Sequence, residues 1–141
     1  YDFTGTALEG LVKPYIILNR GGKRIGVLGV GCPLDGMVAQ HNRQGVTYTD
    51  PRQAIQPIVD LLRNQEHCDL VICLSHLGWD IPGINDQILI AATRGIDIVI
   101  GGHSHTYMEH PQYVPDADGR LVLCYQMGKA ARFVGDINVQ F

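Results

Sequence analysis

The segments CDLVICLSHLG (residues 68–78) and IDIVIGGHSH (residues 96–105) indicate a parallel β-sheet. Each is an apolar, β-branched run of the kind found in parallel strands that are buried on both faces. Between them, residues 88–92 have the spacing of a short helix, with Asn85 or Asp86 as its N-cap. This strand–helix–strand succession predicts a βαβ unit with two parallel strands, and so places the chain in the α/β class.

The segments before this unit predict a hairpin and a longer helix. Residues 14–30 (PYIILNRGGKRIGVLGV) hold two apolar runs around a Gly-Gly pair, which favours a β-hairpin. Asp50 followed by Pro51 is typical of a helix start. Because a proline inside a helix costs about 3 kcal/mol, Pro57 favours either a helix that begins near Gln56 or a separate first turn.

The last part of the chain predicts antiparallel closing strands. These are QYV (residues 112–114), RLVLCYQ (residues 120–126) and FVGDINVQF (residues 133–141). The PDADG segment between the first two, residues 115–119, favours a turn. It matches a calcium-binding loop poorly, because its glycine comes too early and no glutamate closes the loop.

Composition limits the class of protein. The 141 residues, with 45% hydrophobic and 18% charged residues, fit one globular domain over residues 1–141. A net charge of −3 without a basic stripe argues against a nucleic acid polymer as partner. No apolar run reaches the roughly 18 residues of a membrane span. The four cysteines form no C-x-x-C pair, so neither a cysteine zinc site nor a disulfide scaffold is expected.

Three histidines follow the two central strands. His76 ends the first strand, and His103 and His105 come just after the second. Parallel strands end at the same edge of a sheet and lie about 4.8 Å apart, so these imidazoles could share a metal. Glycines at 101 and 102 would let the backbone approach closely. Taken singly, each histidine is more often a solvated or hydrogen-bonded loop residue, but the set predicts a metal site.

Other polar residues near the histidines have weaker patterns. Ser75 and Ser104 adjoin histidines, yet neither lies in the G-x-S-x-G motif of a nucleophilic serine. Asp80 could orient a ligand histidine, although an exposed loop aspartate is the simpler interpretation.

These motifs resemble a known family. VICLSHLGWD (residues 71–80), the aspartate-capped helix and GIDIVIGGHSHT (residues 95–106) are similar to the later half of the catalytic domain of 5′-nucleotidases, within the calcineurin-like metallophosphoesterases. Residues 13–30 resemble the family's segment after its Asn-His motif. Residues 125–141 resemble its closing strands, with Gly128 and the following lysine at the matching place. The resemblance covers essentially the whole chain.

The resemblance implies a fold and a metal site. The family fold is a β-sandwich flanked by helices, of which the βαβ unit and the closing strands would form a part. The family holds two divalent metal ions, for which zinc, manganese or iron suit histidine and carboxylate ligands. By this resemblance His76 and His103 would bind one metal and His105 the other.

The chain departs from the family in what it lacks. No Asp-x-His and no Gly-Asn-His occur, and the only Gly-Asp is Gly135-Asp136 near the C-terminus. No catalytic residue of the family's pattern is therefore expected within the chain. Together with a start at Tyr1 rather than at methionine, this predicts a fragment, the second half of a catalytic domain, that is inactive alone. The alternatives are a self-sufficient three-histidine zinc hydrolase and a non-catalytic, degenerate domain.

The resemblance also implies partners and a location. The parent protein would be a metal-dependent phosphoester hydrolase that acts on a nucleotide or another phosphoester, in nucleotide catabolism. Family members are commonly exported, which favours the periplasm or the cell surface. Because the central strands are apolar on both faces, the half-domain is expected to expose an apolar face and to self-associate through it.

Overall fold

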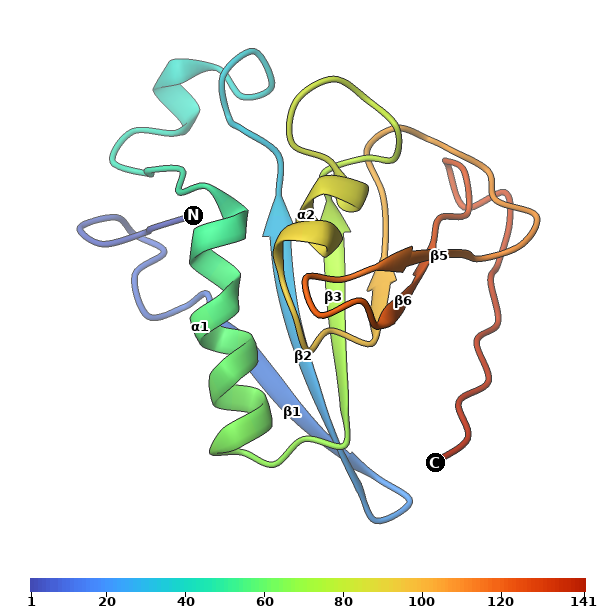
Figure 1. Cartoon of the computed structure of the whole chain (residues 1–141). Helices are drawn as coiled ribbons and strands as arrows, with labels where there is room; N and C mark the ends of the chain where they lie inside the picture. Colours follow the sequence, from blue (N-terminus) through green and yellow to red (C-terminus); the bar gives the residue numbers. More distant parts are fainter.

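The computed structural model describes residues 1–141 and holds one mixed six-stranded sheet with two α-helices packed on it (Figure 1). The strand order across the sheet is β1-β2-β3-β4-β6-β5. The elements in chain order are β1 (Tyr15–Arg20), β2 (Lys23–Gly31), the 3₁₀ turn η1 (Gln40–Asn42), α1 (Pro51–Asn64), β3 (Leu70–His76), α2 (Asp86–Ala92), β4 (Ile98–Ile100), β5 (Gln112–Pro115) and β6 (Leu121–Tyr125).

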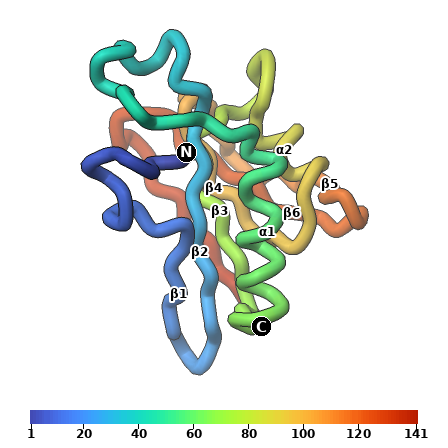
Figure 2. Tube along the Cα trace, turned by 90° about the vertical axis from the view of Figure 1, so that its left-hand side faces the viewer, coloured from blue at the N-terminus to red at the C-terminus, as the bar shows by residue number.

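The hairpin and the βαβ unit are confirmed. β1 and β2 are antiparallel, and Gly21 and Gly22 between them have φ values of 56° and 76°, as a two-residue hairpin turn of type I′ requires. β2 is parallel to β3, and β3 is parallel to β4. Right-handed crossovers between successive parallel neighbours place both helices on the same face, and Figure 2 shows α1 and α2 on one side of the strands.

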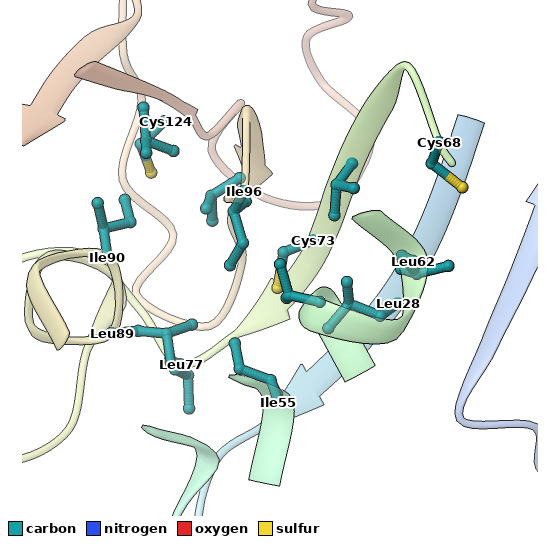
Figure 3. Close-up of a cluster of buried hydrophobic side chains, with 14 residues drawn as sticks. Leu28, Ile55, Leu62, Cys68, Cys73, Leu77, Leu89, Ile90, Ile96 and Cys124 are labelled. Carbon is teal, nitrogen blue, oxygen red and sulfur yellow. The ribbon is translucent and has the colours of Figure 1, made fainter. Parts of the chain in front are cut away.

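The core lies between this face of the sheet and the two helices. It contains side chains from α1, α2 and the inward positions of the strands, several of them drawn in Figure 3. Cys73 and Cys124 are fully buried there, and burial raises the pKa of each thiol to about 12. These two cysteines are therefore small core residues, as their apolar surroundings in the sequence indicated.

The helix α1 differs from the expectation. It is one continuous helix from Pro51 to Asn64, and Pro57 lies inside it. The Asp50 side chain accepts a hydrogen bond from the backbone N–H of Arg52, which caps the helix before Pro57 is reached. Burial of one face, at Ile55, Val59 and Leu62, offsets the helical hydrogen bond that Pro57 cannot donate.

The closing strands agree with the expectation only in part. β5 and β6 form the antiparallel hairpin, and Asp116 accepts hydrogen bonds from the backbone N–H groups of Asp118 and Arg120 in its turn. β6, however, lies parallel to β4. The prediction of a strand over residues 133–141 is wrong: this segment pairs with no neighbouring strand, and Val134 is 92% exposed.

The face of the sheet opposite the helices is partly uncovered. Its strand positions are apolar, and several remain exposed: Ile16 46%, Leu18 37%, Leu74 48% and Ile100 41%. Leu74 and Ile100 are register partners on adjacent strands, so their side chains form a continuous apolar surface. The expected exposed apolar face is thus present. Neither helix has the length and apolar character needed to cross a membrane.

Candidate functional site

The candidate site lies at the edge of the sheet where the parallel strands end. His76 is the last residue of β3, opposite Gly31 of β2. β4 ends at Ile100, the register partner of Leu74, and the chain continues through two glycines to His103. Parallel strands therefore deliver the histidines to one edge, as predicted from their positions after two apolar runs.

The structure brings two of the three histidines together. The ring centroids of His76 and His103 are 5.1 Å apart, and the ring planes meet at 65°. Two imidazoles on one tetrahedral metal, each with a metal–nitrogen distance of about 2.0–2.1 Å, would have centroids about 5 Å apart. The pair thus has the spacing of two ligands of one cation. The assignment of these residues as ligands itself stays a prediction.

Glycine at position 102 permits this approach. A Cβ atom at Gly102 would lie 3.0 Å from Nδ1 of His76 and 3.3 Å from the Ser75 carbonyl oxygen. Gly78 plays a similar part beside the other ring, since its Cβ would lie 3.3 Å from Cδ2 of His103. Gly78 also has a φ of 95°, which a residue with a side chain rarely adopts.

His105 does not join the pair. It is exposed, and no hydrogen bond or ring contact links it to His76 or His103. No three His, Cys, Asp or Glu side chains of the chain gather in a group that could hold a metal ion. The three histidines of the self-sufficient alternative therefore do not meet in one cluster. Asp80 is exposed too and makes no hydrogen bond to a histidine.

A buried carboxyl group lies beneath the histidine edge. Asp86, the first residue of α2, is fully buried, and Oδ1 accepts a hydrogen bond from the hydroxyl of Ser75. Its other oxygen, Oδ2, has no hydrogen-bond partner and would lie 2.8 Å from a Cβ at Gly101. Burial raises the pKa of Asp86 to about 6, against the lowering effect of the Ser75 hydrogen bond.

From the sequence, Asp86 was expected only as a candidate helix cap. The structure gives capping to Asn85, whose side chain accepts from the N–H of Ile88. The sequence signal for the burial of Asp86 was the apolar residues before and after it, at Ile84 and from Ile88 onward. The burial of Gln126 was also not predicted. This side chain, just past β6, is 1% exposed, whereas a polar residue after a closing strand is usually solvated.

The segment after β6 is hydrogen-bonded to the loop that follows β4 and carries His103 and His105, here called the histidine loop (residues 101–106). The N–H of Gly128 donates to the carbonyl of Thr106 at 2.9 Å, and Tyr107 and Met127 form an antiparallel bridge. Gly128 has a φ of 68°, so glycine suits this position. These contacts join the segment after β6 to the loop that carries His103 and His105.

A cleft opens beside His76. It has a volume of about 730 Å³ and lies between the N-terminal segment, the end of β2 and the first turns of α1. Its lining is mixed and includes Tyr48, Ile55 and the β2 glycines Gly29 and Gly31. His76 thus faces a space large enough for a small molecule or for further polypeptide.

The chain is similar to several characterised proteins, although no protein-family model matches it. It is 30% identical to an apyrase of Tabanus yao over 99% of this chain and 27% of that protein. It is 26% identical to a 5′-nucleotidase of Rattus norvegicus over 95% of this chain and 24% of that protein. The chain thus spans about a quarter of the length of these relatives.

Solved structures agree. A 5′-nucleotidase precursor from Thermus thermophilus superposes with a TM-score of 0.72 and 29% identity, covering 84% of this chain and 25% of that one. A calcineurin-like phosphoesterase, YfkN of Bacillus subtilis, shares the fold with a TM-score of 0.59 at 22% identity, over 79% of this chain and 40% of that one. The α/β fold predicted from the two histidine-bearing strands is confirmed.

Proposed function

Because this chain is related over most of its length to 5′-nucleotidases and shares the fold of a calcineurin-like phosphoesterase, we propose that it supplies part of the active site of a metal-dependent phosphoester hydrolase. The substrate class is a nucleotide or another phosphate monoester. The observation that carries the proposal is the His76–His103 pair, 5.1 Å apart at the end of parallel strands, within the segment that matches these relatives.

The roles of the histidines follow from their chemistry. His76 and His103 would hold one divalent cation through their ring nitrogens, and His105 would hold a second one. Imidazole nitrogens suit zinc, manganese or iron better than calcium or magnesium. When bound, such a pair of cations would neutralise phosphate oxygens and would make water a stronger nucleophile near neutral pH. The chain's own contribution is to fix the two rings at the spacing of a shared site and to keep the glycine loop clear of side chains.

The chain acts with a second part that carries the carboxylates. Two imidazoles leave a tetrahedral cation incomplete, and no carboxylate of this chain lies beside the pair. The Asp-x-His and Gly-Asn-His motifs do not occur in it. We therefore expect the 141 residues alone to be inactive, and the missing ligands to come from another part of a longer protein.

Activity measurements test both statements. In the full-length protein, His103→Ala should lower kcat/KM for hydrolysis of a nucleoside monophosphate at least about 100-fold, because one ligand of the metal is lost. The matched control is His110→Ala, an exposed histidine outside the pair, which should stay within about twofold. Full activity of His103→Ala would exclude the ligand role. Ordinary turnover by the isolated chain with zinc or manganese would exclude the statement that the 141 residues lack part of the active site.

Location and self-association complete the proposal. The Thermus relative is a 5′-nucleotidase precursor, and a precursor form supports export, to the periplasm or the cell surface.

The exposed apolar face around Leu74 and Ile100 supports self-association of the isolated chain. Light scattering tests the latter: the wild type should form dimers at high concentration, and Leu74→Lys should shift it to monomer. A wild-type chain that stays monomeric would exclude self-association.

A further inference from the structure

The structure assigns a positioning role to Ser104, whose hydroxyl holds the histidine loop in its strained, site-forming conformation together with Gln126 and Thr106. This inference rests on the proposed metal site, but it concerns contacts within the chain that can be tested without a metal. Ser104 lies between the two loop histidines and has no role in the proposal above.

The loop needs such support because its backbone is strained. His103 has a φ of 76° and His105 a φ of 58°, so two non-glycine residues occupy the left-handed region within three positions. This conformation costs a residue with a side chain roughly 1–2 kcal/mol and persists only where surrounding contacts fix it. Without those contacts, His103 would relax toward extended or right-handed conformations, and its ring would leave His76.

The Ser104 hydroxyl supplies these contacts. It accepts a hydrogen bond from the backbone N–H of Trp79 at 2.9 Å and donates to Oε1 of Gln126 at 2.9 Å. The hydroxyl of Thr106 lies 2.8 Å away and, since the Ser104 proton is already engaged, acts as donor. A hydroxyl has one proton and two lone pairs, so Ser104 is fully satisfied by these three partners.

The three partners come from three different segments. Trp79 follows His76 in the loop after β3, Thr106 belongs to the histidine loop, and Gln126 follows β6. Gln126 is 1% exposed, and its backbone carbonyl accepts from the N–H of Met108 at 3.0 Å. The hydroxyl therefore links the segment after His76 to the segment after His103, which are the two segments that must stay in register for the rings to meet.

Other candidates for this role are excluded by their positions. Asp80 is exposed and makes no hydrogen bond to either ring. Ser75 bonds Asp86 and the N–H of Leu77, and so supports the β3 end rather than the loop. Ser104 is thus the side chain that acts directly on the left-handed loop.

The experiment compares variants of the isotope-labelled 141-residue chain in which a hydroxyl group is deleted. Two readouts are measured by NMR: the NOE between ring protons of His76 and His103, and the dissociation constant for Zn²⁺ from shifts of the same protons. Ser104→Ala should abolish the NOE and weaken zinc binding about 5- to 30-fold, the ratio that corresponds to release of the left-handed strain. Thr106→Val, which removes one of the three bonds, should weaken zinc binding by a smaller factor.

Thr93→Val is the matched control. Thr93 is 1% exposed and donates to the carbonyl of Leu89 at 2.9 Å, so this change also deletes a buried hydroxyl but at the far end of α2 from the loop. It should lower the unfolding temperature while the NOE and the zinc affinity stay unchanged.

Two results would overturn the inference. One is a Ser104→Ala chain, or a Thr106→Val chain if Ser104→Ala does not fold, that keeps the NOE and binds zinc as tightly as wild type does. The other is a Thr93→Val chain that loses both readouts equally, since the effect would then follow general stability. A wild-type chain that shows the NOE but no zinc binding would be consistent with ligands supplied by another part of the protein, and the NOE alone would then decide the role of Ser104.

Discussion

Replacing the buried Asp86 by asparagine should make the protein's stability less sensitive to pH. Asp86 has no solvent exposure, and burial raises its pKa to about 6 from an ordinary value of 3.8. The folded state therefore holds the Asp86 proton more tightly than the unfolded chain does. The resulting stabilisation is fully present below about pH 3.8 and is lost as the pH rises through 6.

The size of the effect follows from the same shift. A difference of about two pKa units corresponds to about 3 kcal/mol between the two protonation states. Asparagine at position 86 does not titrate, so the free energy of unfolding of Asp86→Asn relative to wild type should rise by up to about 3 kcal/mol between about pH 4 and pH 7. Any constant packing difference between the two side chains cancels in this comparison across pH.

Urea unfolding followed by circular dichroism provides the measurement. Both proteins are unfolded at about pH 4, 5, 6 and 7, and the difference in unfolding free energy is plotted against pH. This difference should rise as the pH passes from about 4 to about 6 and beyond. A difference that stays flat across this range would show that Asp86 is ionised at no cost, and would refute its burial without a partner for Oδ2.

Three further predictions test the fold. Ala131 has a φ of 51°, so Ala131→Gly should stabilise the chain by about 1 kcal/mol in urea unfolding, and a loss of stability would contradict this left-handed turn. Leu62→Ala should lower the free energy of unfolding by about 2–5 kcal/mol, because Leu62 is fully buried against the sheet. Leu121→Ala, at a 66% exposed position, should lower it by under about 0.5 kcal/mol, and equal losses would refute the assigned core. Asn85→Ala should lower the free energy of unfolding by about 1–2 kcal/mol, because the side-chain cap on the N–H of Ile88 is lost. An unchanged urea midpoint would exclude that cap.

Much of the site could be predicted because its residues follow strong local patterns. Two apolar runs with an intervening helix fix two parallel strands, and histidines directly after them must then meet at one edge. The glycine at position 102 had a clear reason in the sequence as well, and a Cβ there would lie 3.0 Å from the His76 ring. These inferences need only the chain between residues 68 and 105.

The remaining features depend on contacts that local patterns do not record. Pro57 fits inside α1 because the helix is capped at Asp50 and buried along one face, which outweighs the missing hydrogen bond. The segment over residues 133–141 has strand-like residues but no strand beside it, so alternation alone was misleading. The role of Ser104 depends on Gln126, 22 positions away, and on Trp79, 25 positions away, and neither partner is suggested by spacing.

The proposed function depends on His76 and His103 holding one divalent cation together. A Zn²⁺ titration of the labelled wild-type chain, followed through the ring protons of all six histidines, tests it most directly. The resonances of His76 and His103 should shift first and with the same midpoint, and either His→Ala change should remove the shift of the other ring. A titration in which the exposed His41, His67 or His110 responds first, or in which the pair responds with two unrelated midpoints, would contradict a shared metal site.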